Sequence, residues 1–188
     1  MKKVFIVILT VFLFTSCEKE DAELNQSLLT AEQSADARSL ASFQAQAPLS
    51  GADEVPPRET RARGVATFHL NKDGDELRFR LNVANIENVV GAHIHLGGPE
   101  DNGPVVVPLY AAPAGGGRFS GTLAEGVITA ADLTGPLAGM TLDALLDEMK
   151  AGNTYVNVHT NDGVAPPNTG PGDFPGGEIR GQLKTNWK

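Results

Sequence analysis

The chain has 188 residues, which predicts one domain with flanking segments. Hydrophobic residues make up 41% of it, a share that argues against disorder throughout. The formal net charge of -8 argues against nucleic acid as a partner, because phosphate groups repel an acidic surface. A content of 21 glycines and 12 prolines favours short strands joined by tight turns over a helical bundle. The single cysteine excludes an internal disulfide framework.

The first seventeen residues have the pattern of an export signal. Residues 1–3 form a short basic start, and residues 4–14 are apolar except for one threonine. This run fits the apolar region of a signal peptide and falls short of the ~20 residues that span a membrane. Residues 15–17, Thr-Ser-Cys, resemble the lipobox of bacterial lipoproteins, which implies that Cys17 is acylated, as with palmitate, and becomes the new N-terminus. The alternative is an ordinary signal peptide followed by an incidental cysteine.

A lipid on Cys17 would anchor the chain to a membrane of the cell envelope, on its periplasmic or cell-surface side. A single acyl chain binds a membrane only marginally, whereas the several chains of a lipoprotein hold firmly. Residues 18–46 are rich in Ala, Ser, Gln and Glu, and they are predicted to be a flexible tether that spans roughly 30 Å. Their acidic start, residues 18–21, resembles a stretch that directs some lipoproteins to the cell surface, or it is a solvated spacer.

Residues 47–188 are predicted to form an all-β, mainly antiparallel domain. The clearest strand is 76–84, where apolar and polar residues alternate. One helix is predicted at 141–150, because apolar residues recur there at helical spacing, Thr141 can cap its start and Gly152 follows its end. Many short strands with turns between them favour a Greek-key-like β-sandwich or barrel. The other predicted strands are 64–70, 88–96, 104–110, 155–160 and 178–184, with shorter extended pieces at 118–123 and 127–129.

Four motifs in this order resemble the CHRD domain, the repeat named for chordin. They are Ala-His-Ile-His-Leu-Gly at 92–97, Gly-Pro-Val-Val-Val at 103–107, Gly-Asn-Thr-Tyr-Val-Asn-Val-His-Thr at 152–160 and Pro-Gly-Gly-Glu-Ile-Arg-Gly-Gln-Leu at 175–183. The resemblance covers about 49–184 and implies an extracytoplasmic, β-rich module without an established enzyme activity. In chordin the domain belongs to a secreted protein that binds growth factors.

Three histidines of these motifs are candidate metal ligands. Strand alternation places His93 and His95 on one face of their strand, and it places His159 on the same face as Tyr155 and Asn157 of another. The three imidazoles converge if the two strands pair, and imidazole suits copper, zinc, iron or nickel. A shared metal requires that they meet within about 4 Å of one point. Two other interpretations stay open, a hydrogen-bonding network and a catalytic role.

Two charged residues of the last predicted strand, Glu178 and Arg180, share one face. They are interpreted either as a cross-strand ion-pair network or as outer partners of the histidines, with Glu178 as a possible fourth ligand. The fourth histidine, His69, is predicted to lie on a solvated strand face. Lipidation of Cys17 would leave no free thiol for catalysis.

The sequence therefore predicts a membrane-tethered, non-enzymatic binding module. Its partners would be the membrane, through the lipid, and a protein or polysaccharide, with no nucleic acid. The first alternative is a metal-binding or redox protein that holds copper or zinc through its histidines. The second is a structural or adhesive surface protein that needs no metal. The sequence names no certain cofactor, and it shows no catalytic pattern that would make the chain an enzyme.

Overall fold

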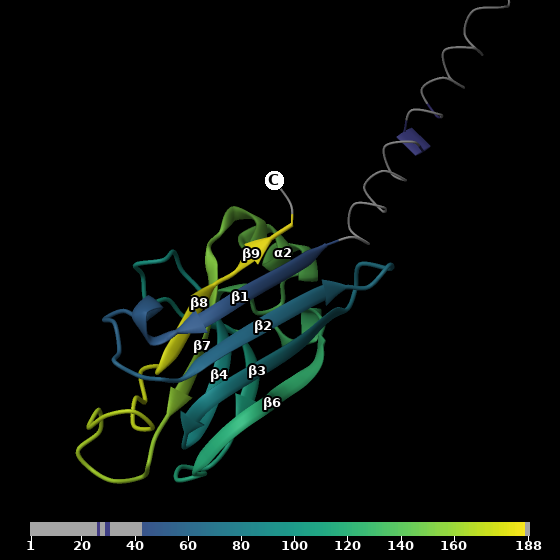
Figure 1. The fold of residues 1–188 in the computed structure, drawn as a ribbon. Helices are drawn as coiled ribbons and strands as arrows, with labels where there is room; N and C mark the ends of the chain where they lie inside the picture. Colours follow the sequence, from purple (N-terminus) through teal and green to yellow (C-terminus); the bar gives the residue numbers. More distant parts are fainter. Residues whose placement is uncertain (1–25, 27–28, 31–42, 187–188) are drawn as a thin grey trace, which may run out of the picture. The chain divides into compact units, whose positions relative to one another are not determined.

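The computed structural model describes residues 26, 29–30 and 43–186, and the fold is drawn in Figure 1. By its contacts the chain divides into a unit of residues 1–36 and a unit of residues 37–188. In the first unit the described residues are helical, and the Thr30 hydroxyl donates a hydrogen bond to the Gln26 carbonyl at 3.0 Å. Cys17, the predicted signal segment and most of the predicted tether lie outside the described residues.

The described part of the second unit contains nine antiparallel strands. They form one sheet in the order β5-β4-β7-β8-β1-β2-β3-β6, with β9 paired to β1. The edge strands β5 and β6 approach each other, so the sheet curls into a nearly closed barrel (Figure 1). The strands are β1 Gln44–Ser50, β2 Arg63–Leu70, β3 Leu77–Glu87, β4 Val89–Leu96, β5 Val105–Ala111, β6 Arg118–Ile128, β7 Thr154–Thr160, β8 Ile179–Gln182 and β9 Lys184–Thr185.

The barrel has two halves that the chain visits alternately. One half is β6-β3-β2-β1 and the other is β8-β7-β4-β5, and they meet where Ser50 of β1 pairs with Arg180 of β8. The chain leaves the first half after β3, returns to it for β6 and then crosses back to β7. This antiparallel, interleaved order confirms the predicted all-β fold class. At the junction the strands approach so closely that a Cβ atom on Gly181 would overlap the Pro48 carbonyl.

The core of the barrel is filled by alternate residues of the strands and is closed at one side by helix α2, Leu142–Ala151. The apolar stripe of α2 is buried as predicted and consists of Leu142, Leu145, Leu146 and Met149. The helix ends at Gly152, whose φ of 76° is a left-handed conformation that glycine adopts without strain. Thr141 is the N-cap residue, but its side chain makes no capping hydrogen bond. Three short 3-10 helices complete the fold: η1 Gly51–Asp53, η2 Ala130–Asp132 and η3 Gly135–Leu137.

Some strand boundaries differ from the prediction. Strand β1, Gln44–Ser50, was not predicted, and its first three residues lie in the stretch predicted as tether. The sequence signal was weak, because two of its three buried positions are small alanines that alternate with glutamine. The two extended pieces predicted at 118–123 and 127–129 are wrong as separate elements, since Arg118–Ile128 is one strand. Its residues are mostly exposed, and two register shifts interrupt its pairing with β3, so no clean alternation marks it.

None of the helices in the described part of the chain has both the length and the apolar character to cross a membrane.

Candidate functional site

A group of polar side chains lies on the face of β4, β7 and β8 that points away from the barrel core. The core-facing residues of these strands are apolar, among them Ile94, Val156 and Ile179. Cross-strand pairing aligns the residues of the opposite face in two rows, His93–Asn157–Arg180 and His95–Tyr155–Gln182. His159 follows Asn157 on the same face of β7. We call these seven side chains the polar face: His93, His95, Tyr155, Asn157, His159, Arg180 and Gln182.

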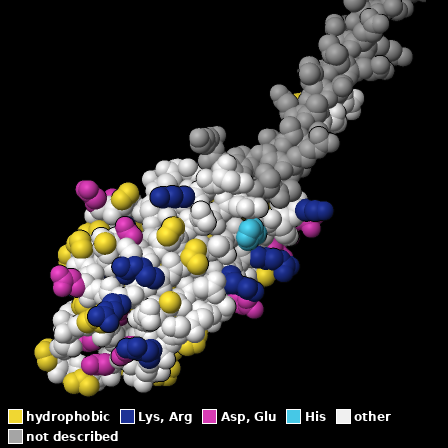
Figure 2. Space-filling model, viewed as in Figure 1, with side chains coloured by type: hydrophobic (Ala, Val, Ile, Leu, Met, Phe, Trp, Pro, Cys, Tyr) yellow, Lys and Arg dark blue, Asp and Glu magenta, His cyan; other side chains and the backbone are white. Residues whose placement is uncertain are grey.

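Two loops cover the polar face and supply backbone oxygens to it. The loop after β4 provides the carbonyl of Gly98 to Arg180 and that of Gly103 to His95. The loop before β8 provides the Pro175 carbonyl to His159. The other half of the barrel is different: Figure 2 views it and shows basic and acidic side chains interspersed on an open surface. One of its exposed ion pairs joins Arg80 to Glu125 at 2.8 Å.

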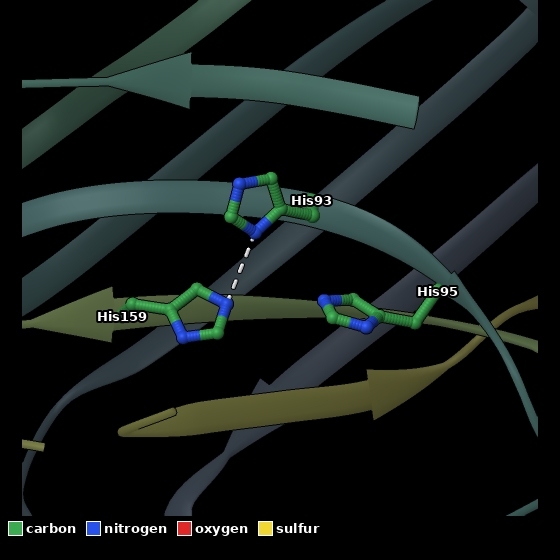
Figure 3. Close-up of side chains that lie close together, drawn as sticks. All are labelled: His93, His95 and His159. Atoms are coloured by element: carbon green, nitrogen blue, oxygen red, sulfur yellow. Dashed lines mark hydrogen bonds between the residues drawn. The ribbon is translucent and has the colours of Figure 1, made fainter. Parts of the chain in front are cut away.

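The three predicted histidines of the polar face come together (Figure 3). His93 Nδ1 lies 3.1 Å from His159 Nε2, and the ring centres of His93 and His95 are 5.6 Å apart. One nitrogen from each ring lies within 4.8 Å of the other two. Three such atoms fit in a sphere with a radius of at most about 2.8 Å (4.8 Å divided by √3), so they meet the sequence-based condition of about 4 Å from one point.

Backbone carbonyls fix which nitrogen of two rings carries the proton. His95 Nδ1 lies 2.9 Å from the Gly103 oxygen, and His159 Nδ1 lies 2.9 Å from the Pro175 oxygen. Because a carbonyl only accepts, each Nδ1 donates, and a neutral ring then has a lone pair on Nε2. The lone pair of His159 accepts from His93, whereas Nε2 of His95 is buried and has no hydrogen-bond partner.

The three imidazoles are held in their neutral form. The pKa of His93 is lowered to about 4, mainly by burial and also by electrostatic repulsion from His159 and His95. Burial is also the main cause that lowers the pKa of His95 and of His159, against the carbonyls of Gly103 and Pro175, which favour protonation. Neutral imidazole is the form that binds metal ions, so the site is in a metal-binding protonation state at pH 7.

Arg180 is linked to His95 through the ring of Tyr155. Its guanidinium carbon lies 3.4 Å from the centre of the Tyr155 ring, and that ring stacks on His95 at 4.9 Å with an angle of 12°. Arg180 donates to the Gly98 carbonyl at 2.6 Å, and the Tyr155 hydroxyl accepts from the Gly103 amide at 3.1 Å. The stack therefore holds the ring of His95 in place, and the Tyr155 ring lies between His95 and the guanidinium of Arg180.

Glu178, predicted as a partner or ligand at the histidines, has its hydrogen bonds elsewhere. It is fully buried and accepts from the Thr60 hydroxyl at 2.6 Å, the Thr160 hydroxyl at 2.7 Å and the Gly172 amide at 2.8 Å. The ion pairs between described residues include none that joins it to Arg180. Glu178 thus ties the segment before β2 and the loop before β8 to the end of β7.

Two further buried groups of this region were not recognised as site residues from the sequence. Asn157 lies near His95 and favours its protonated form, although His95 Nε2 and Asn157 Oδ1 make no hydrogen bond. Glu54 is only 4% exposed, and burial raises its pKa to about 7 against the opposing charges of Arg180 and Arg58. No motif marks Glu54, because an acidic residue in a proline-rich loop gives the pattern of an ordinary exposed turn.

The fourth histidine is outside the cluster. His69 is exposed on β2, on the other half of the barrel, where it pairs with Arg78 of β3. This confirms the prediction of a solvated strand face. It also provides an internal control for any property assigned to the other three histidines.

Fold and site together define a class, an antiparallel β-barrel module with a loop-covered, histidine-bearing face. A model of the CHRD domain matches residues 45–183, most of the chain, and the chain belongs to that family. The match spans β1 to β8 and includes all seven residues of the polar face. The search of curated proteins returned no match.

Proposed function

We propose that this chain is a non-enzymatic CHRD binding module that is held at the cell envelope by a lipid on Cys17. Its binding site is the polar face. One observation carries this site: buried polar atoms without partners gather there. Among the described residues six buried side-chain atoms have no hydrogen-bond partner, and they include His95 Nε2, Asn157 Oδ1 and Gln182 Oε1 of the polar face and Oε1 of neighbouring Glu54.

Unpaired buried atoms point to a missing partner. More than nine in ten buried polar groups in proteins have a hydrogen-bond partner, and each exception needs an explanation such as an ion, a water molecule or a ligand. Four exceptions in one place support a binding site. A cleft lined by Glu54, Pro99, Arg180 and Gln182 gives solvent access to one end of this region.

The tether rests on the sequence. The basic start, the short apolar run and the small residues before Cys17 support export followed by lipidation. Residues 18–43, between this cysteine and β1, would span roughly 30 Å as a flexible chain. Several acyl chains would make the attachment stable.

Metabolic labelling with palmitate tests the tether. The wild-type chain expressed in a bacterial host is expected to incorporate the label, and Cys17→Ala is expected to incorporate none. Ser16→Ala, which keeps a small residue before the cysteine, serves as the matched control and should be labelled like the wild type. Label that is absent from the wild type, or that persists in Cys17→Ala, would contradict the proposed anchor.

A further inference from the structure

We infer that His93, His95 and His159 bind one late first-row transition-metal ion, copper(II) most tightly and zinc more weakly. The inference rests on the proposed function, because it names the ligand of the polar face. The ion would bind His95 and His159 through Nε2, and His93 through Nδ1, the nitrogen that faces His159 (Figure 3).

Two of the three donor atoms, Nε2 of His95 and Nε2 of His159, have a lone pair before any metal arrives. Metal-ligating histidines usually donate their second ring N–H to a carbonyl or carboxylate, which fixes the tautomer and orients the ring. His95 and His159 do this through Gly103 and Pro175. Nε2 of His95 is the strongest single indication, since this side chain is only 8% exposed and the atom has no partner.

The separations are close to those of a metal site. The three ring nitrogens lie within 4.8 Å of one another, so one point exists that is no more than about 2.8 Å from all three. A zinc–imidazole bond is roughly 2.1 Å long. Inward shifts of less than about 1 Å would therefore complete the coordination. His93 Nδ1 now donates to His159 Nε2, so its proton must move to Nε2 of the same ring when both nitrogens bind the ion. The net charge of the ligands does not change.

The chemistry of the donors selects the ion. Three neutral imidazoles without a thiolate or a carboxylate suit copper and zinc, whereas calcium and magnesium require oxygen ligands. The general order of affinities for such nitrogen sites places copper(II) above nickel and zinc. Three protein ligands leave a position for water, and the unpaired Oδ1 of Asn157 is available beside His95 to accept a hydrogen bond from it.

The test is a titration of the full-length chain, purified in detergent and stripped of metal, with copper(II) and with zinc. We expect one equivalent of copper to bind, with nitrogen hyperfine structure in its electron paramagnetic resonance spectrum. At 100 times the dissociation constant the melting temperature should rise by roughly 5–10 °C. His95→Gln and His159→Gln should weaken copper binding at least 100-fold, and His69→Gln should leave it unchanged.

A second measurement uses only the wild-type chain, so it remains informative if a substitution prevents folding. In the wild-type chain labelled with ¹⁵N-histidine, zinc should shift the ring signals of three histidines and leave those of His69 in place. The inference would be overturned by equal copper affinity in His95→Gln and wild type, by zinc shifts confined to His69, or by no binding. An ordered water molecule would then be the hydrogen-bond partner of His95 Nε2. Palmitate labelling of Cys17 is independent of these results, so failure of the metal site and failure of the tether are distinguishable.

Discussion

His95 is enclosed by three kinds of contact, and together they set its chemistry. The Gly103 carbonyl fixes its proton, the Tyr155 ring stacks on one side, and Asn157 lies beside its other nitrogen. The buried lone pair on the His95 ring costs free energy while it has no partner. Binding an ion would recover that cost, and this supports the proposed metal site over a purely structural histidine network.

Glu54 is predicted to give stability a pH dependence of its own. Its folded pKa of about 7 lies above its ordinary value of 4.5, so the folded chain binds a proton between these values that the unfolded chain has released. The contribution of protonated Glu54 to the stability of the folded chain is fully present below pH 4.5 and is lost as the pH rises through 7. The variant Glu54→Gln cannot ionise. We therefore expect its free energy of unfolding, relative to that of the wild type, to increase by up to about 3 kcal/mol between pH 4 and pH 8. Denaturant unfolding across that range measures this, and a difference that does not change with pH would contradict it.

At the scale of elements, the junction of β1 and β8 joins the two halves of the barrel and carries one end of the polar face. Arg180 pairs with Ser50 there, and its neighbour Gly181 lies against the backbone of Pro48. Backbone atoms cannot move aside as the end of a side chain can. The close approach therefore makes this junction depend on a residue without a Cβ atom.

Gly181→Ala is predicted to destabilise the domain by about 2 kcal/mol or more, because its Cβ would overlap the Pro48 carbonyl. Gly116→Ala is the matched control, since a Cβ there meets nothing within 4 Å. Denaturant midpoints of the two variants are compared with that of the wild type. Equal midpoints for Gly181→Ala and Gly116→Ala would show that the strands at the junction can separate at little cost.

The elements also show what the sequence could predict and where it could not. Strands such as β3 and β7 were found because apolar and polar residues alternate in them, and this alternation placed the three histidines on the correct faces. The pairing of β4 with β7 then brought them together. The contacts that finish the site come from loops, through Gly103, Pro175 and Glu54, and loop positions have no periodicity that a sequence pattern could reveal.

At the scale of the whole molecule, the barrel presents two dissimilar outer surfaces. One half carries an open, mixed-charge surface, and the other carries the polar face under its loops. Burying ionisable groups on one side makes the stability of the entire domain sensitive to their protonation, because an unfolded chain exposes all of them to water.

The metal-free protein is predicted to lose stability in acid through His93. Its folded pKa of about 4 lies below the ordinary 6.5, so the unfolded chain takes up a proton first as the pH falls. The loss should extend from pH 6.5 down to pH 4 and should be smaller in His93→Gln, which cannot take up that proton. Thermal unfolding in the presence of a chelator measures the difference. An acid loss that is the same in His93→Gln and wild type would contradict the assigned cause.

Diffraction from copper-soaked crystals, recorded above and below the copper absorption edge, would locate an ion held by the three histidines of the polar face. We expect one strong anomalous peak at about 2 Å from nitrogens of His93, His95 and His159. A peak at His69 or at surface carboxylates alone, or no peak between the three rings, would rule out the proposed metal site.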